Sequence, residues 1–156
     1  MGSIPKAGDK APDFDLAKDG GGRMSLASLA GRKLVLYFYP KDDTSGCTKE
    51  ALDFSRLRSA FAAAGTEVVG VSADSVESHD KFKKKHRLDL TLLSDDGKAV
   101  LEAYGVWVEK SMYGRSYMGV ERTTVLIDPS GKIARVWSKV KVPGHADDVL
   151  KAAQQL

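Results

Sequence analysis

The segment LVLYFYPKDDTSGCTKEALDF, residues 34–54, joins a run of strand-forming residues to a helical pattern through a polar loop. Its first six residues, Leu34 to Tyr39, are all apolar or aromatic, which is typical of a strand buried on both faces of a sheet. Apolar residues then recur at helical spacing from Ala51 to Ala64, where Gly65 supplies a stop. Because residues 68–71 read as the next strand, the spacing predicts a βαβ unit with parallel strands.

The rest of the chain extends this unit on both sides. Gly20-Gly21-Gly22 predicts a hairpin turn in front of it, and no Gly-Lys-Ser/Thr follows that would make a phosphate loop. Behind it we expect a helix from Asp74 or Ser75 to about residue 86, a short helix ending near residue 105, and a hairpin over residues 123–137. A last helix over residues 145–155 should bury Val149, Ala153 and Leu156. The predicted fold class is α/β: one domain, residues 1–156, with a thioredoxin-like central mixed sheet flanked by helices and an extra N-terminal β-hairpin.

Composition excludes several classes of protein. The chain has 156 residues, 42% of them hydrophobic and 29% charged, and a net charge of +3, which is too small to predict nucleic-acid binding. No apolar run approaches the ~20 residues that cross a bilayer, and the first residues do not resemble a secretory signal. A single cysteine excludes an internal disulfide framework and a Cys-rich metal site. We therefore expect a cytoplasmic protein without nucleic-acid or membrane partners.

The single cysteine, Cys47, is the chemically informative residue. A lone cysteine is most often a small buried hydrophobe. This one follows Thr44-Ser45-Gly46 and precedes Thr48, at the predicted start of a helix, in a loop that is polar for a core position. Unpaired N–H groups of the first helical turn would face its sulfur and favour the thiolate. The position predicts a thiol that ionises and attacks.

The same residues resemble a known family. Pro40-x-x-x-Thr44-x-x-Cys47-Thr48 resembles the active-site signature of the peroxiredoxins, and YFYPKDDTSGCTKEA resembles the subfamily called bacterioferritin comigratory protein or peroxiredoxin Q. GDKAPDFDL, VVGVSADS, LLSDDGKAVLEAYGVW and ERTTVLIDPSGKI are similar to that subfamily in order and spacing, so the resemblance runs from about residue 6 to residue 150.

The resemblance implies a thiol-dependent peroxidase that reduces hydrogen peroxide and organic hydroperoxides without a cofactor or metal. Cys47 would be the peroxidatic thiolate that becomes a sulfenic acid, Pro40 would shield the site, and Thr44 would hydrogen-bond at the sulfur and the peroxide. Arg122 would approach Cys47 from the strand that begins there. This is an antioxidant role in cell redox homeostasis.

Three further side chains are candidates for supporting roles. Glu50 lies one helical turn after Cys47 and would repel a thiolate unless Arg122 bridges the two; the alternative is a solvated first-turn acid. Tyr39 and Trp107 could form apolar walls of the pocket, or they could be plain core aromatics.

The chain also departs from the subfamily pattern. Many members carry a second, resolving cysteine five residues after the first, where this chain has Leu52; others carry it in the next helix, where residues 80–85 contain none. A one-cysteine mechanism is implied, with resolution by an external thiol (thioredoxin, glutaredoxin, glutathione or a small thiol) or by Cys47 of a second copy. The protein would then be a monomer or weak homodimer. Ser45 replaces the proline that often precedes Gly-Cys, which should loosen the loop.

Other readings remain open at this point. Cys47 could be a redox sensor without turnover, a disulfide reductase lacking its second cysteine, or the nucleophile of a Cys–His hydrolase. His79, His86 and His145 have no partners at ligand spacing, so we expect surface or boundary histidines and no metal site. The basic run at residues 81–87 is expected to be a solvated helix face, and Asp42-Asp43 to be turn or cap residues.

Overall fold

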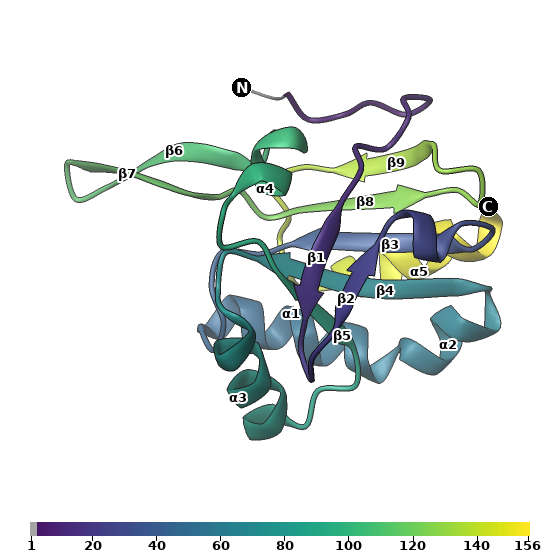
Figure 1. Ribbon diagram of the computed structural model, residues 1–156, viewed down its shortest axis with the longest axis horizontal. Coiled ribbons are helices and arrows are strands. Elements are labelled where there is room, and N and C mark those ends of the chain that lie inside the picture. Colours follow the sequence, from purple (N-terminus) through teal and green to yellow (C-terminus); the bar gives the residue numbers. More distant parts are fainter. Residues whose placement is uncertain (1–2) are drawn as a thin grey trace.

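The computed structural model describes residues 3–156 and is built on a seven-stranded mixed sheet with the order β2-β1-β5-β4-β3-β8-β9 (Figure 1). A separate two-stranded sheet is formed by β6 and β7. The strands are β1 Asp15–Lys18, β2 Arg23–Ser25, β3 Lys33–Phe38, β4 Thr66–Ser72, β5 Thr91–Ser94, β6 Trp107–Met112, β7 Arg115–Val120, β8 Thr123–Ile127 and β9 Ile133–Trp137. The helices are the 3-10 helix η1 Ala27–Leu29 and α1 Ser45–Arg56, α2 Arg58–Ala63, α3 Val76–His86, α4 Ala99–Ala103 and α5 His145–Gln155.

The predicted βαβ unit lies at the centre of the sheet. β3 pairs with β4 in parallel, with Val35 opposite Val68, and β4 pairs with β5 in parallel. β8 lies antiparallel on the other side of β3. With strands on both sides and helices on both faces, residues 34–38 of β3 are at most 1% exposed, which explains their continuous apolar sequence.

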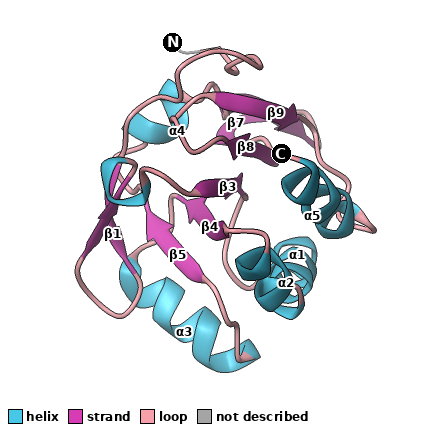
Figure 2. Cartoon of the chain, turned by 90° about the vertical axis from the view of Figure 1, so that its right-hand side faces the viewer, coloured by secondary structure: helices cyan, strands magenta, loops and turns pink. Residues whose placement is uncertain are grey.

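Alternate side chains of β3 pack into two separate hydrophobic cores, one on each face of the sheet. Val35 and Tyr37 share a cluster with residues of four helices, whereas Leu36 and Phe38 point to the opposite face. Figure 2 shows the corresponding layers, with α1, α2, α3 and α5 on one face of the sheet and α4 on the other. The helical members of the first cluster include Phe54 of α1, Phe61 of α2, Phe82 of α3 and Val149 of α5; those of the second are Leu29 of η1 and Val100 and Leu101 of α4. The mixed sheet with helices on both faces confirms the predicted fold class.

The N-terminal and C-terminal hairpins also follow the prediction. β1 and β2 are antiparallel around Gly20-Gly21-Gly22, whose φ angles are all positive, as only glycine adopts freely. β8 and β9 are antiparallel, and the turn between them is closed by Asp128, whose carboxylate accepts the N–H groups of Ser130 and Lys132.

Strand β5 and the β6–β7 hairpin were not predicted. β5, which lies between α3 and the following turn, has only four residues, and these are too few to show the alternation of apolar and polar residues that predicts a strand. β6 and β7 form a hairpin that projects from the body of the molecule (Figure 1), so most of its side chains are exposed on both faces and no apolar alternation marks it. Its two-residue turn has positive φ at Tyr113 and Gly114, a conformation for which Asn-Gly is the usual signal.

Two smaller expectations were wrong. The single helix predicted to reach Ala64 is divided at Leu57 into α1 and α2. Leu156 is 47% exposed because it lies beyond the end of α5, whose packing against the core ends with Ala153.

The topology determines where a site can form. Because β3 and β8 are antiparallel, with Phe38 opposite Thr123, the carboxyl end of β3 and the amino end of β8 meet at one edge of the sheet. The loop from Pro40 to Thr44, which leads from β3 into the first turn of α1, lies at this edge, and Arg122 immediately precedes β8 there. Residues 75 positions apart in sequence are thus brought together.

Candidate active site

Cys47 lies in the first turn of α1 and is buried. It is the third residue of the helix after the N-cap residue Thr44, and only 1% of its surface is exposed. One side of it belongs to the apolar cluster beneath α1. The rest of its surroundings is the polar loop and the Arg122 guanidinium.

The N-terminus of α1 is not capped by a side chain. The Thr44 hydroxyl donates to the carbonyl oxygen of Lys41, 2.8 Å away, and makes no capping bond. Within residues 3–156 no protein acceptor binds the N–H groups of Ser45, Gly46 and Cys47. These N–H groups and the positive end of the helix dipole therefore remain available to an anion at the sulfur. The predicted bond between Thr44 and the sulfur is absent, but the hydroxyl oxygen can still accept a hydrogen bond.

Arg122 binds Cys47 and Glu50 at the same time. Its Nη2 donates to Sγ of Cys47 at 3.4 Å, and its Nη1 donates to Oε1 of Glu50 at 2.6 Å. Gly46 leaves room for this approach: a Cβ on that residue would lie 3.1 Å from Nη2, so the guanidinium would have to shift slightly. The backbone carbonyl of Arg122 accepts from Val140, which ties the residue to the loop after β9.

Glu50 is not the solvated acid that the sequence left open. It is 1% exposed, and its second oxygen, Oε2, has no hydrogen-bond partner among the described residues. Burial raises the pKa of Glu50 to about 7, although the Arg122 guanidinium opposes the rise. Burial likewise opposes the charge of Arg122, but Glu50 and Cys47 outweigh it and raise the pKa of Arg122.

The other predicted site residues are less closely grouped. Pro40 is half-buried at the start of the loop, and Thr44 is exposed at its end. Tyr39 is buried in the same cluster as Cys47, but its hydroxyl binds Asp42 rather than the site. Trp107 packs against the cluster on the other face of the sheet, with the Lys98 ammonium over its ring.

The expectation for the histidines was wrong in two of three cases. His79 is fully buried and binds the carboxylate of Asp42, and His145 is 6% exposed and binds the Thr124 hydroxyl through Nε2. Asp42 and His79 are 37 positions apart in sequence, so no local motif joins them. Asp42 is correspondingly a buried ion-pair partner and not a simple turn residue. His86 binds the exposed Asp43.

One cationic residue near the site was missed. Lys110 of β6 is half-buried. Its pKa is lowered, mainly by burial and next by the nearby charge of Arg122, while Cys47 opposes the shift. It was missed because the β6–β7 hairpin was not predicted. No sequence pattern around it signals the position.

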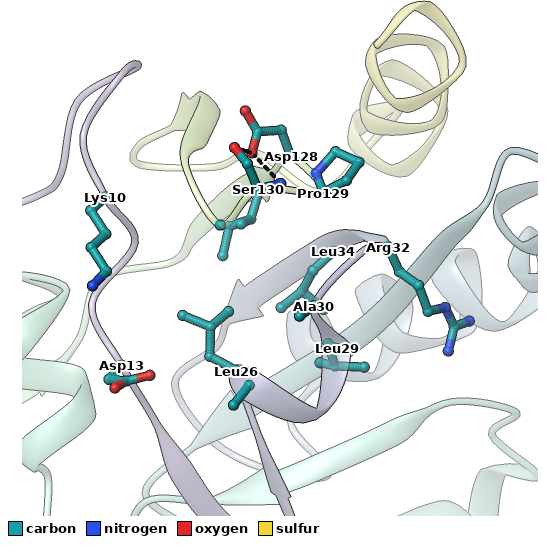
Figure 3. Close-up of a pocket in the computed structure, with 13 residues that line it drawn as sticks. Lys10, Asp13, Leu26, Leu29, Ala30, Arg32, Leu34, Asp128, Pro129 and Ser130 are labelled. Carbon is teal, nitrogen blue, oxygen red and sulfur yellow. Dashed lines mark hydrogen bonds between the residues drawn. The ribbon is translucent and has the colours of Figure 1, made fainter.

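A cavity of about 190 Å³ lies elsewhere, at the opposite end of β3 and β8 (Figure 3). Its walls combine apolar residues at η1, Leu29 within it and Leu26 just before it, with Lys10, Arg32 and the turn at Asp128. None of the predicted site residues lines it. Within residues 3–156 there is no group of three His, Cys, Asp or Glu side chains that could hold a metal ion.

Comparison with known proteins places the chain in a family. The model of the AhpC/TSA family matches residues 7–136. Peroxiredoxin Bcp of Bacillus subtilis is 46% identical over 149 residues, covering 96% of this chain and 95% of the relative.

Solved structures agree with the sequence comparison. Peroxiredoxin Q of Xanthomonas campestris superposes with a TM-score of 0.90 at 46% identity, covering 96% of this chain and 97% of the other. A structure of the X. campestris bacterioferritin comigratory protein, described for its alkyl peroxide reduction activity, has a TM-score of 0.90 at 45% identity and covers 96% and 98% of the two chains. The chain therefore belongs to the AhpC/TSA family, within its bacterioferritin comigratory protein or peroxiredoxin Q subfamily, and has the thioredoxin-like fold that its sequence predicts.

Proposed function

We propose that this protein is a one-cysteine peroxiredoxin that reduces hydrogen peroxide and organic hydroperoxides with Cys47. The thiolate attacks the O–O bond of ROOH, a sulfur–oxygen bond forms, and the alkoxide leaves and takes up a proton as ROH. Cys47 is oxidised to a sulfenic acid and the peroxide is reduced. The observation that carries the proposal is the bond of 3.4 Å from Arg122 to Sγ in the unpaired first turn of α1.

Ionisation of the thiol alone would not make a fast peroxidase. For a generic thiol, lowering the pKa from 8.5 to 6 raises the thiolate fraction at pH 7 about 30-fold. The same change lowers the intrinsic nucleophilicity roughly tenfold. Because the net gain is only a few-fold, the larger factor must come from donors preorganised at the departing oxygen.

The loop supplies such donors around one position next to the sulfur. The guanidinium of Arg122 and the free N–H groups of the first turn of α1 can donate to the negative charge that develops on the departing oxygen. The Thr44 hydroxyl, whose hydrogen is committed to Lys41, offers its oxygen to the O–H of the peroxide. Pro40, before the loop, restricts the access of water. Glu50 holds Arg122 in place, so it acts as a positioning residue.

The second half of the cycle needs an external thiol. Since the chain has one cysteine, the sulfenic acid condenses with RSH to give Cys47–S–S–R and water, and a second thiol then releases Cys47 and a disulfide. Thioredoxin, glutaredoxin, glutathione and small thiols have the required chemistry. A second copy could also supply the thiol through its own Cys47, which fits a monomer that forms a weak homodimer.

Substrate and compartment follow from the same features. The X. campestris relative is described by its alkyl peroxide reduction activity, which supports organic hydroperoxides as substrates here. A lone cysteine that depends on external thiols works best in a reducing compartment, so we place the protein in the cytoplasm, in cell redox homeostasis. No helix within residues 3–156 has the length and apolar character to cross a membrane.

The proposal predicts sustained turnover that depends on Cys47 alone. With excess dithiothreitol, the wild-type protein should remove many equivalents of hydrogen peroxide, and Cys47→Ser should remove none above the background reaction. Peroxide loss is followed by a colorimetric assay. Consumption of one equivalent followed by arrest would instead identify a redox sensor.

Arg122 should contribute more than thiolate formation. We expect Arg122→Ala to lower the rate of peroxide reduction at least ~100-fold, as for loss of an oxyanion donor. The drop should exceed what the change in thiolate fraction, measured by absorbance near 240 nm, accounts for. Because Arg122→Ala leaves Glu50 buried without a partner, the double variant Arg122→Ala/Glu50→Gln is measured beside it, against Glu50→Gln alone. A rate loss equal to the thiolate change would contradict this role.

Glu50 should make stability depend on pH. Its folded pKa of about 7 lies above the ordinary value of 4.5, so its favourable contribution is complete below about pH 4.5 and is lost as the pH rises through 7. Glu50→Gln stays neutral, so its free energy of unfolding relative to wild type should improve by about 2 kcal/mol between pH 5 and pH 8. Urea unfolding at both pH values measures this. Glu109→Gln, at an exposed carboxylate, should run parallel to wild type, and parallel behaviour of Glu50→Gln would refute the prediction.

A further inference from the structure

The burial of Cys47 creates a problem for the second half of the cycle. At 1% exposure the sulfur is too deeply buried for a protein or peptide thiol to form a disulfide with it in this conformation. The loop before α1, or the first turn of α1, must therefore move. The interactions that hold this loop to the rest of the fold determine how easily it moves.

Asp42 is the buried attachment point of the loop. It is 7% exposed; its Oδ2 accepts from the Ser78 hydroxyl at 2.8 Å and from Nδ1 of His79 at 2.7 Å, both on α3. Its Oδ1 accepts from the Tyr39 hydroxyl. Its own N–H donates to Asp74 at 2.8 Å. The carboxylate thus joins the end of β3, the loop and α3 at one point.

The contacts of His79 are those of a charged ring beside the Asp42 carboxylate. Nδ1 faces the Asp42 carboxylate, and Nε2 lies 2.8 Å from the carbonyl oxygen of Leu93. Ionised Asp42 and the Leu93 carbonyl both accept, so each ring nitrogen donates, as in an imidazolium. Burial opposes the charge, but the hydrogen bonds and charge of Asp42 outweigh it and raise the pKa of His79. The two side chains therefore form a buried ion pair, and removal of one partner leaves the other as a buried charge without compensation.

A second, exposed attachment lies beside the first. Asp43, whose φ is +58°, accepts from Nζ of Lys85 and Nε2 of His86, each at 2.7 Å. These residues are one end of α3, and Ser78 and His79 lie near the other. Exposed pairs of this kind contribute little because water screens them. The exposed contact therefore serves as a control for the buried one.

We propose that Asp42 and His79 form a positioning pair for Cys47, which holds the loop in the conformation that reduces peroxide and limits exposure of the sulfur to larger thiols. Thr44 and Ser45, at the start of α1, follow Asp42 within three residues, so release of Asp42 frees the chain that leads into the first turn. The pair does not touch the reacting atoms. This inference rests on the proposed function for its role, but the opening that it controls can be measured without peroxide.

The test compares matched His→Gln variants on one helix. Reduced wild type, His79→Gln and His86→Gln are labelled at Cys47 with the bulky aromatic disulfide 5,5′-dithiobis(2-nitrobenzoate), without denaturant. His79→Gln should label at least ~10-fold faster than wild type because the loop opens locally. His86→Gln should stay within about twofold, as for an exposed pair. Urea unfolding of each variant gives the labelling rate that global unfolding alone would cause, and the proposal requires labelling faster than that.

A kinetic split separates positioning from a merely structural role. In rapid-mixing experiments, His79→Gln should reduce peroxide more slowly, while its sulfenic acid reacts faster with thioredoxin. Labelling of His79→Gln at the wild-type rate, or equal acceleration in His86→Gln, would overturn the proposal. If His79→Gln does not fold, Ser78→Ala decides: faster labelling than wild type supports the pair, and unchanged labelling overturns it. The two proposals can fail separately. If the wild-type protein does not turn over peroxide but His79→Gln still labels faster, the proposed function is refuted and the positioning pair stands.

Discussion

The Arg122 guanidinium lies between two buried acidic groups, the thiol of Cys47 and the carboxyl of Glu50, and the active site depends on this contact. Several features of the chain are needed for it. The antiparallel register of β3 and β8 brings Arg122 to the edge where α1 begins, and Gly46 leaves room for the guanidinium. The helix presents Cys47 and Glu50 on one face because they are three residues apart. The contact between the cation and the sulfur therefore depends on the strand register, on the helical spacing and on the space beside Gly46.

The burial of Glu50 beside Arg122 and Cys47 lowers the stability of the fold but fixes the orientation of the guanidinium. A buried carboxyl with one unpaired oxygen is costly, and its charge opposes a thiolate nearby. Arg122 offsets both effects but only in part, since the pKa of Glu50 remains raised to about 7. In return the guanidinium is held in one orientation before any substrate arrives, which is the condition for electrostatic stabilisation of a transition state. In the proposed mechanism Glu50 acts through Arg122, to which it is bonded, and not by contact with the peroxide.

The sequence predicted those parts of the fold and site that depend on local patterns. The apolar strand β3, the turn signals at Gly20–Gly22 and the helical spacing after Cys47 gave the βαβ unit and the flanking hairpins. Cys47 and Arg122 were found through a motif and a family resemblance, whereas the bridge to Glu50 was one of two alternatives that the sequence left open. The ion pair of Asp42 and His79 could not be found in this way, because 37 residues separate its partners and the loop geometry alone joins them. The β6–β7 hairpin was not predicted because most of its side chains are exposed on both faces. Its sequence therefore lacks the alternation of apolar and polar residues on which strand prediction relies.

The central claim is that the site accelerates attack on a peroxide specifically and does not simply supply a thiolate. The most direct measurement compares two electrophiles on the same reduced protein: the rate constants of Cys47 with hydrogen peroxide and with iodoacetamide, each relative to a free low-molecular-weight thiol. Alkylation needs only a thiolate and access to it, whereas peroxide reduction also uses Arg122 and the first turn of α1. The account predicts that the peroxide-to-iodoacetamide ratio exceeds that of the free thiol by at least ~10³. Equal ratios for the protein and the free thiol would contradict it.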